Sequence, residues 1–136
     1  MNLTRFDPHS LKRAGRAALL LLGCAALAGC RAPRAQNDLG VRLSLAPTPP
    51  RVGQATLTLH LSDHGKALNQ ARVRVEGNMT HPGMYPVRAS ARFVGEGTYR
   101  VPDFSLSMAG DWIVTVEASK GGRVLSADVP LEVGEP

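Results

Sequence analysis

The sequence predicts an all-β protein built as one antiparallel β-sandwich of about seven strands. Three observations support this class. From Leu39 onward, apolar and polar residues alternate repeatedly, which is the period of a half-buried strand. No segment beyond that point shows the period of a helix. Turn signals rich in Gly, Pro and Asp separate the alternating stretches, and short strands at this spacing are typical of an immunoglobulin-like sandwich.

The expected strands follow from these alternations and from the residues that end them. In chain order they are residues 41–45, 55–61, 71–75, 87–93, 99–101, 104–108, 112–117 and 125–129. Residues 47–50 contain three prolines and break the first strand, while Gly121 and Gly122 suit a tight hairpin. Pro102 and Pro130 are expected to interrupt the strands in which they fall.

One aromatic cluster is expected to anchor the core. Trp112 is the only tryptophan, and we expect it to pack with Phe93 and Tyr99. Fully burying a large apolar side chain stabilises a protein by roughly 1.5–3 kcal/mol. This cluster matters for the stability of the domain, because the mature domain is expected to have no disulfide.

The N-terminus has the features of a bacterial lipoprotein signal peptide. Lys12, Arg13 and Arg16 precede an apolar run over residues 17–28, which is too short to span a bilayer comfortably. The run ends in Leu-Ala-Gly-Cys, which resembles a lipobox and predicts cleavage before Cys30 and lipidation of its sulfur by diacylglycerol, with N-acylation in many bacteria. The alternative is ordinary secretory cleavage, with Cys30 as a bystander.

The domain organisation follows from this leader. Residues 1–29 are the expected signal peptide, 30–38 a lipidated tether, and 39–136 the folded domain. Two or three acyl chains would hold the domain on a bacterial membrane, facing the periplasm or the outside of the cell. Cys24, the other cysteine, would leave with the signal peptide, so the mature domain would have no disulfide and no thiolate ligand.

The charge argues against a nucleic-acid partner. The formal net charge of +5 is largely a property of the leader, and the rest of the chain has a net charge of only +2. Its basic residues are interleaved with acids in the sequence, so no basic face is evident and the charges are interpreted as ordinary solvated surface. No nucleophile elbow, phosphate-binding glycine loop or zinc-protease helix is present, so we expect no enzyme activity.

Three stretches resemble one protein family. They are LSDHGKALNQARVRV (61–75), NMTHPGM (78–84) and GTYRVPDFSLSMAGDWIVTVEA (97–118). Together they are similar to the YtkA-like domain, related to the FixH-like family, over roughly residues 40–133. The resemblance implies a small extracytoplasmic β-sandwich, and it implies an association with copper handling or with the assembly of copper-containing oxidases. FixH-like members usually have a transmembrane anchor, whereas here a lipid would replace it.

The residues around the middle stretch are the candidate metal site. Met79, His81 and Met84 lie within six residues, and thioether and imidazole ligands suit Cu(I) better than zinc or magnesium. Met79 and His81 are two residues apart, so in a strand their side chains would point to the same side. The bend at residues 82–83 could return Met84 towards them. Met108 is the candidate fourth ligand.

Two other interpretations of these residues stay open. Methionine also fills gaps in cores, and Met108 shares its parity with Phe104 and Leu106. Alternatively, Met79, Met84 and Tyr85 form an apolar loop tip, and the domain is an immunoglobulin-like interaction module that binds a partner protein of the cell envelope without metal. His60 and His64 are expected to be exposed surface residues.

Overall fold

A computed structural model describes residues 38–136. The expected signal peptide, Cys30 and the tether up to residue 37 lie outside the described residues. The described residues form eight β-strands and no helix. The strands are β1 (Leu39–Ala46), β2 (Gly53–Asp63), β3 (Lys66–Ala67), β4 (Arg72–Met79), β5 (Val87–Gly95), β6 (Thr98–Leu106), β7 (Gly110–Lys120) and β8 (Arg123–Val133). The prediction of an all-β antiparallel fold is confirmed.

The strands form one continuous sheet in the order β1-β2-β6-β5-β4-β7-β8, with the short β3 paired to β2. The expected separation into two sheets is not found in residues 38–136, and the reason lies in β5. Its first half pairs with β4 from Val87 to Ala91, and its second half pairs with β6 from Arg92 to Gly95. One strand therefore belongs to both halves of the sheet.

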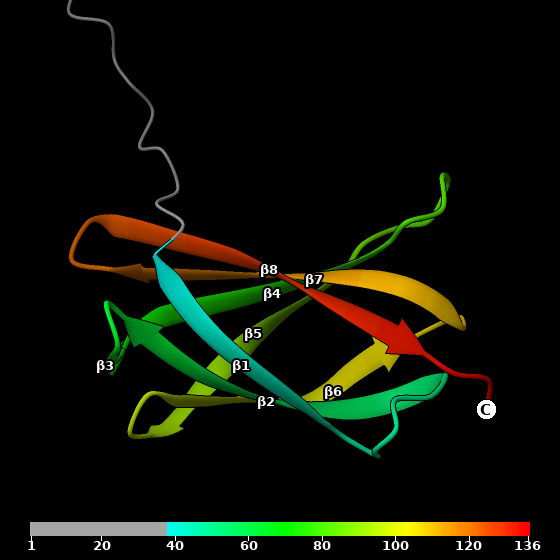
Figure 1. The fold of residues 1–136 in the computed structure, drawn as a ribbon, viewed down its shortest axis with the longest axis horizontal. Coiled ribbons are helices and arrows are strands. Elements are labelled where there is room, and N and C mark those ends of the chain that lie inside the picture. The colour runs from blue at the N-terminus through cyan, green and yellow to red at the C-terminus, as the bar shows by residue number, and fades with distance from the viewer. Residues whose placement is uncertain (1–37) are drawn as a thin grey trace, which may run out of the picture. The chain divides into compact units, whose positions relative to one another are not determined.

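The sheet folds over until its two ends meet (Figure 1). β1 and β8, the two ends of the strand order, lie beside each other. The Val52 amide donates to the Gly134 carbonyl at 3.0 Å, and the Gly134 amide donates to the Pro50 carbonyl at 2.9 Å. The sheet is thus nearly closed, which leaves little unpaired edge for contact with other chains.

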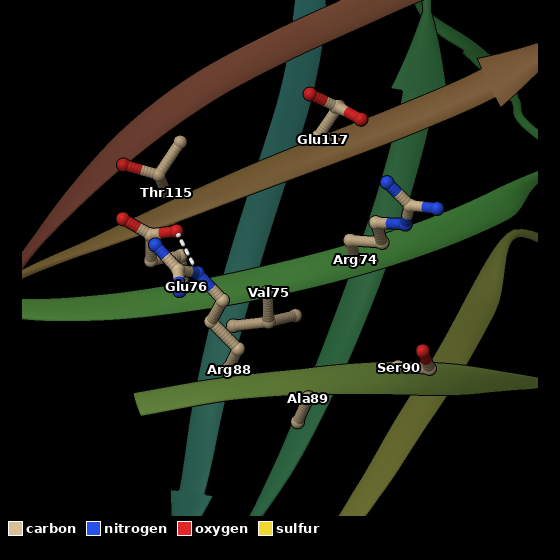
Figure 2. A pocket seen from close by; sticks show the side chains of 8 residues that line it. All are labelled: Arg74, Val75, Glu76, Arg88, Ala89, Ser90, Thr115 and Glu117. Atoms are coloured by element: carbon tan, nitrogen blue, oxygen red, sulfur yellow. Dashed lines mark hydrogen bonds and ion pairs between the residues drawn. The ribbon is translucent and has the colours of Figure 1, made fainter. Parts of the chain in front are cut away.

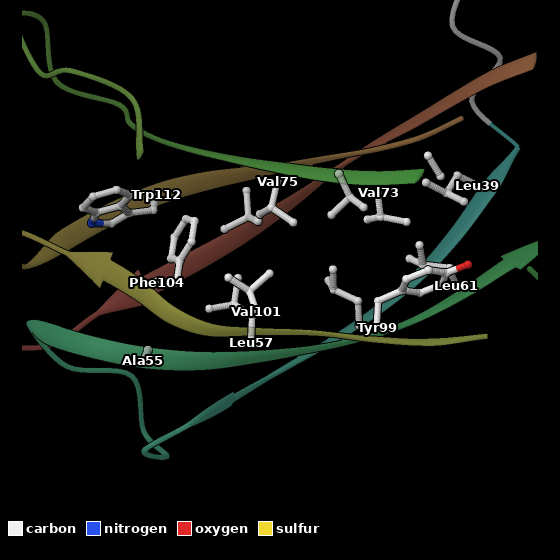
Figure 3. Close-up of a cluster of buried hydrophobic side chains, with 14 of the residues drawn as sticks. Leu39, Ala55, Leu57, Leu61, Val73, Val75, Tyr99, Val101, Phe104 and Trp112 are labelled. Carbon is white, nitrogen blue, oxygen red and sulfur yellow. The ribbon is translucent and has the colours of Figure 1, made fainter. Parts of the chain in front are cut away.

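The core fills the space between the two halves of the folded sheet (Figure 3). Alternate residues of the long strands point inward, as the period of two requires. The buried apolar residues of the described chain range from Leu39 to Val133. A fragment that begins at Arg31 therefore keeps every core residue and is expected to fold without the leader.

The aromatic residues occupy two ends of the core rather than one cluster. Phe93 and Tyr99 pack together as predicted, with ring centroids 5.3 Å apart. Trp112 instead lies by Phe104, at the other end of the core (Figure 3). A Cβ on Gly77 would come within 2.7 Å of the Phe104 ring, so this ring packs directly on the β4 backbone. Tyr99 and Phe104 are five residues apart on β6, or roughly 16 Å, which separates the two groups.

Neither proline interrupts its strand, contrary to the prediction. In β6, Pro102 and Asp103 together face the single residue Thr56, because the register shifts between Ala55 and Leu57. The Thr56 hydroxyl donates to the Pro102 carbonyl at 3.0 Å, and a bulge of this kind accommodates proline. Pro130 lies in β8, at the end of the strand order, where a missing amide proton is tolerated.

Candidate functional site

Two connections lie at one end of the domain and, together with Met79 at the end of β4, they contain all the predicted metal ligands. The first, residues 80–86, joins β4 to β5 and projects beyond the sheet (Figure 1). The second, residues 107–109, joins β6 to β7. The Thr80 amide donates to the Asp111 carbonyl at 3.1 Å, and Met79 pairs with Trp112 across β4 and β7. We call this region the Met/His end.

Met79 is the last residue of β4 and belongs to the core. Its side chain is only 9% exposed. Its terminal methyl would lie 3.3 Å from a Cβ at Gly110, so the absence of a side chain there makes room for the thioether. Met79 therefore supplies a buried sulfur beneath the two connections.

The other two methionines are nearer the surface. Met84 is partly buried against the core, whereas the Met108 side chain is 48% exposed. The backbone of Met108 is nevertheless held in place, because the Trp112 indole Nε1 donates to its carbonyl at 3.0 Å. The turn is fixed by its backbone while the thioether remains accessible.

His81 and Tyr85 are exposed in the first connection. The Tyr85 side chain is 92% exposed, the largest value among the exposed large hydrophobic residues of the described chain. His60 and His64 are also exposed, as predicted.

Two of the parity arguments from the sequence do not hold at this end. β4 stops at Met79 and the chain bends after it, so Met79 is buried while His81 faces solvent. β6 stops at Leu106, so Met108 does not share the buried environment of Phe104 and Leu106. Alternation predicts the side to which a side chain points only within a strand, and His81 and Met108 both lie beyond the end of a strand.

The base of the first connection is held by polar contacts on the outer face. The side-chain amide Nδ2 of Asn78 donates to Glu76 Oε1 at 2.8 Å. Arg88 Nε donates to Glu76 Oε2 at 2.7 Å (Figure 2). These bonds, first that of Asn78 and then that of Arg88, hold the pKa of Glu76 below its usual value. The ion pair joins β4 to β5 on either side of the loop.

Acid is expected to remove the contribution of Glu76. A carboxylate whose folded pKa is lowered stabilises the fold above its unfolded pKa of about 4.3, and this stability is lost as the pH falls through the folded value. Glu76→Gln should lower the unfolding free energy at pH 7 by up to about 1 kcal/mol, because the pair is partly exposed. Urea unfolding at pH 7 and at a pH below the unfolded pKa should show this difference shrinking in acid. A difference that is the same at both pH values would contradict the assignment.

The opposite end of the domain is fixed by contacts that the sequence did not reveal. Arg123 Nη1 lies 2.9 Å from Asp63 Oδ2, and His64 Nδ1 lies 2.6 Å from Asp63 Oδ1. The bonds from Arg123 and then from His64 lower the pKa of Asp63. The Tyr99 hydroxyl donates to the Leu68 carbonyl and accepts from the Ala71 amide. These contacts hold residues 63–71 against the sheet.

The donor types present favour soft metals over hard ones. No three His, Cys, Asp or Glu side chains come together as a metal site in residues 38–136. The Met/His end offers thioethers and one imidazole instead, which are ligands of Cu(I). No α-helix capable of crossing a membrane occurs in the described part of the chain.

The described residues form a small all-β domain with three methionines and one histidine at one end. The family model described as YtkA-like matches residues 34–117. The chain belongs to the YtkA-like family, as the sequence motifs predicted, and the family suggests an accessory extracytoplasmic domain. No curated protein matches the chain. The match ends within β7, yet β8 pairs with β7 along its whole length and contributes Leu125 and Val133 to the core.

Proposed function

We propose that this protein is a non-enzymatic accessory domain, lipid-anchored in the cell envelope through Cys30, that binds Cu(I) at its Met/His end. One observation carries the proposal: the three methionines of the described chain lie at a single end, together with His81. The lipid anchor rests on the sequence of the leader.

The chemistry of the donor set supports Cu(I) in particular. Met108 and His81 are exposed, Met84 is partly buried, and Met79 is a buried sulfur at the same end. Thioethers and a neutral imidazole bring no negative charge, so they suit a soft monovalent ion better than Zn²⁺ or Cu²⁺. The donor types therefore suit a Cu(I) ion, for which Met84, Met108 and His81 are the proposed ligands.

The position of this end relative to the tether supports a role in passing metal to another molecule. Leu39, where the domain begins, pairs with Asp63 at the end opposite Met79. β4 runs between the two ends over eight residues, which is roughly 25 Å. A domain tethered through residues 30–38 would thus present the Met/His end away from its point of attachment.

The test is an anaerobic Cu(I) titration of fragment 31–136 against a competing chelator. Wild type is expected to bind one ion. The double variant Met84→Leu/Met108→Leu removes two sulfurs and keeps the apolar volume. Changes to residues that only support a metal ligand lower metal affinity by roughly 10–100-fold, so the loss of two ligands should lower the Cu(I) affinity by at least that much. His81→Asn should also weaken binding, whereas His60→Asn, which lies on β2 away from this end, should not.

The outcomes separate the possible ligand sets. Met79→Leu tells whether the buried sulfur takes part, since leucine preserves the packing under Gly110. Failure of the folded wild type to bind Cu(I) would overturn the metal proposal.

The exposure of Tyr85 favours a second candidate function. An aromatic side chain that is 92% exposed on a projecting connection is a common anchor for a protein partner. In that case the Met/His end contacts another protein of the cell envelope without metal. Photo-crosslinking from position 85 in cells would identify this partner, and it would be the result to seek if no Cu(I) binds.

A further inference from the structure

A hollow on the outer face of the sheet lies beside the start of the folded domain. It has a volume of about 420 Å³ and is lined by β1, β2 and β3, which lie side by side (Figure 1), and by the turn between β5 and β6. One of its lining residues is Gly40, the second residue of β1. Sites for small ligands usually have volumes of about 300–1,000 Å³, so the hollow is large enough for one small molecule.

The hollow arises because one row of the sheet carries only small side chains. Gly40 is opposite Ser62, and Ser62 is opposite Ala67 on β3. A side chain on Gly40 would collide with the Ser62 hydroxyl, so the residue at this position must stay small. The next row on the same face carries the long side chains of Arg42 and His60, which are opposite each other. The strand register therefore places a low row beside a high one.

Three groups of different charge line the hollow. Arg42 and His60 are on β1 and β2, and Glu96 is in the turn between β5 and β6. The His60 Nδ1 lies 3.0 Å from Thr98 Oγ1, so Nε2 is the ring nitrogen that remains for a ligand. Arg42 and Glu96 are both exposed, and neither forms an ion pair within residues 38–136. The hollow thus offers one guanidinium, one imidazole and one carboxylate.

The other charged groups near the start of the domain have partners of their own or point elsewhere. Asp63 contacts Arg123 at 2.9 Å, and Asp38 lies 3.6 Å from His64 Nε2. Lys66 is opposite Asp63, and alternation along β2 and β3 points both of these side chains away from the low row. The positive charge of the guanidinium is therefore balanced within the hollow by the single carboxylate.

We propose that this hollow binds a zwitterionic phosphoethanolamine group, with Arg42 and His60 on the phosphate oxygens and Glu96 on the ammonium. Guanidinium groups suit phosphate oxygens. Glu96 repels a simple anion and Arg42 repels a simple cation, whereas a ligand with both charges is attracted by both residues.

The spacing of the charged residues favours this ligand over an α-amino acid. Arg42 lies on β1, while Glu96 lies beyond β6, which is two strands away, or roughly 10 Å across the sheet. Phosphoethanolamine carries its two charges at the ends of a short chain. The charged groups of an α-amino acid are attached to a single carbon, so they span less of the hollow.

The position of the hollow favours the headgroup of phosphatidylethanolamine as the source of this group. Gly40 follows the tether of residues 30–38 almost directly. Nine residues span at most about 30 Å, so a domain attached through Cys30 stays within reach of the bilayer surface. This source rests on the proposed lipid anchor, whereas the site itself depends neither on the anchor nor on copper. A soluble phosphoethanolamine ester is the alternative source.

The first test is an NMR titration of fragment 31–136 with soluble glycerophosphoethanolamine. The amide signals of Gly40 and Gly65, which line the hollow, should shift and saturate. Glycerophosphocholine should bind more weakly, because its methylated nitrogen cannot donate a hydrogen bond to Glu96. Arg42→Gln should lower the affinity about 10-fold or more. The control Arg74→Gln removes the same charge from β4, outside the hollow, and should leave the affinity unchanged.

Glu96→Gln gives the sharpest test, because its effect should have opposite signs for two ligands. It should weaken the binding of glycerophosphoethanolamine by removing the partner of the ammonium. It should strengthen the binding of inorganic phosphate by removing a like charge. Stronger binding of both ligands would mean that the hollow is only an anion site and would overturn the proposal. The absence of saturable shifts at Gly40 and Gly65 in the folded wild type would overturn it too.

Co-sedimentation with vesicles separates the two sources. Vesicles of phosphatidylcholine with and without phosphatidylethanolamine both have no net charge, so the comparison isolates the headgroup. Binding that requires phosphatidylethanolamine supports the lipid as the source. Binding of glycerophosphoethanolamine without binding of these vesicles would overturn the lipid source and assign the site to a soluble ester.

Two histidine variants separate this proposal from copper binding. His60→Asn should weaken the binding of glycerophosphoethanolamine and leave the Cu(I) affinity unchanged. His81→Asn should do the reverse, because it lies in the connection between β4 and β5, outside the hollow. Loss of both activities in either variant, with the melting temperature unchanged, would contradict the assignment of two separate sites.

Discussion

Replacing Trp112 with alanine is expected to lower the free energy of unfolding by about 3–5 kcal/mol. The indole is 1% exposed and packs beside Phe104 against the β4 backbone at Gly77. Alanine would leave a cavity in a core that is close-packed on both sides. Domains of this size have a total stability of about 5–15 kcal/mol, so the variant would be close to unfolding at room temperature.

Trp112→Phe separates packing from hydrogen bonding. Phenylalanine keeps much of the ring but loses the Nε1 bond to the Met108 carbonyl, which is worth about 0.5–1.5 kcal/mol. Urea unfolding of both variants gives the two free energies. The phenylalanine variant should also loosen the turn that carries Met108, so its Cu(I) affinity should fall more than its stability accounts for. A Trp112→Ala domain within about 1 kcal/mol of wild type would contradict the assigned core.

Replacing Tyr99 with phenylalanine is expected to cost about 2–3 kcal/mol, although only one oxygen is removed. The buried hydroxyl donates to the Leu68 carbonyl at 2.7 Å and accepts from the Ala71 amide at 2.9 Å. Its loss leaves a buried carbonyl and a partly buried amide without these partners. The segment between β3 and β4 has no strand ladder of its own, so this hydroxyl is a main contact that holds it.

The matched control is Tyr85→Phe, which removes the same oxygen from a side chain that is 92% exposed and should leave stability unchanged. Hydrogen exchange gives a local readout, because the Ala71 amide should exchange faster in Tyr99→Phe than in wild type. Equal unfolding free energies for Tyr99→Phe and wild type would show that water replaces the hydroxyl at no cost.

Both ends of the domain therefore depend on side chains that bond to backbone outside the strands. Trp112 holds the turn of the Met/His end, and Tyr99 holds residues 68–71 at the other. A loop that must present ligands or a partner surface needs a rigid support. The sheet supplies it through these two aromatic residues, one at each end of the core.

The sequence by itself determined the strands and the family. Alternation of apolar and polar residues is a local property, and it identified every long strand of the described chain except at the ends and at the two prolines. The order and spacing of three motifs identified the YtkA-like family. The sequence also identified the Met/His stretch as the candidate site, because soft ligands are recognisable from residue type alone.

Tertiary structure alone decided which of these residues share an environment. Alternation along the sequence predicted that Met79 would point to the same side as His81, and Met108 to the same side as Phe104. However, β4 ends before His81 and β6 ends before Met108, so Met79 is buried and Met108 is half exposed. Strand order, which no local pattern encodes, put Arg74 on β4 opposite Glu117 on β7. Opposite charges from distant parts of the chain thereby share one outer face, because a sheet brings together strands that are far apart in the sequence.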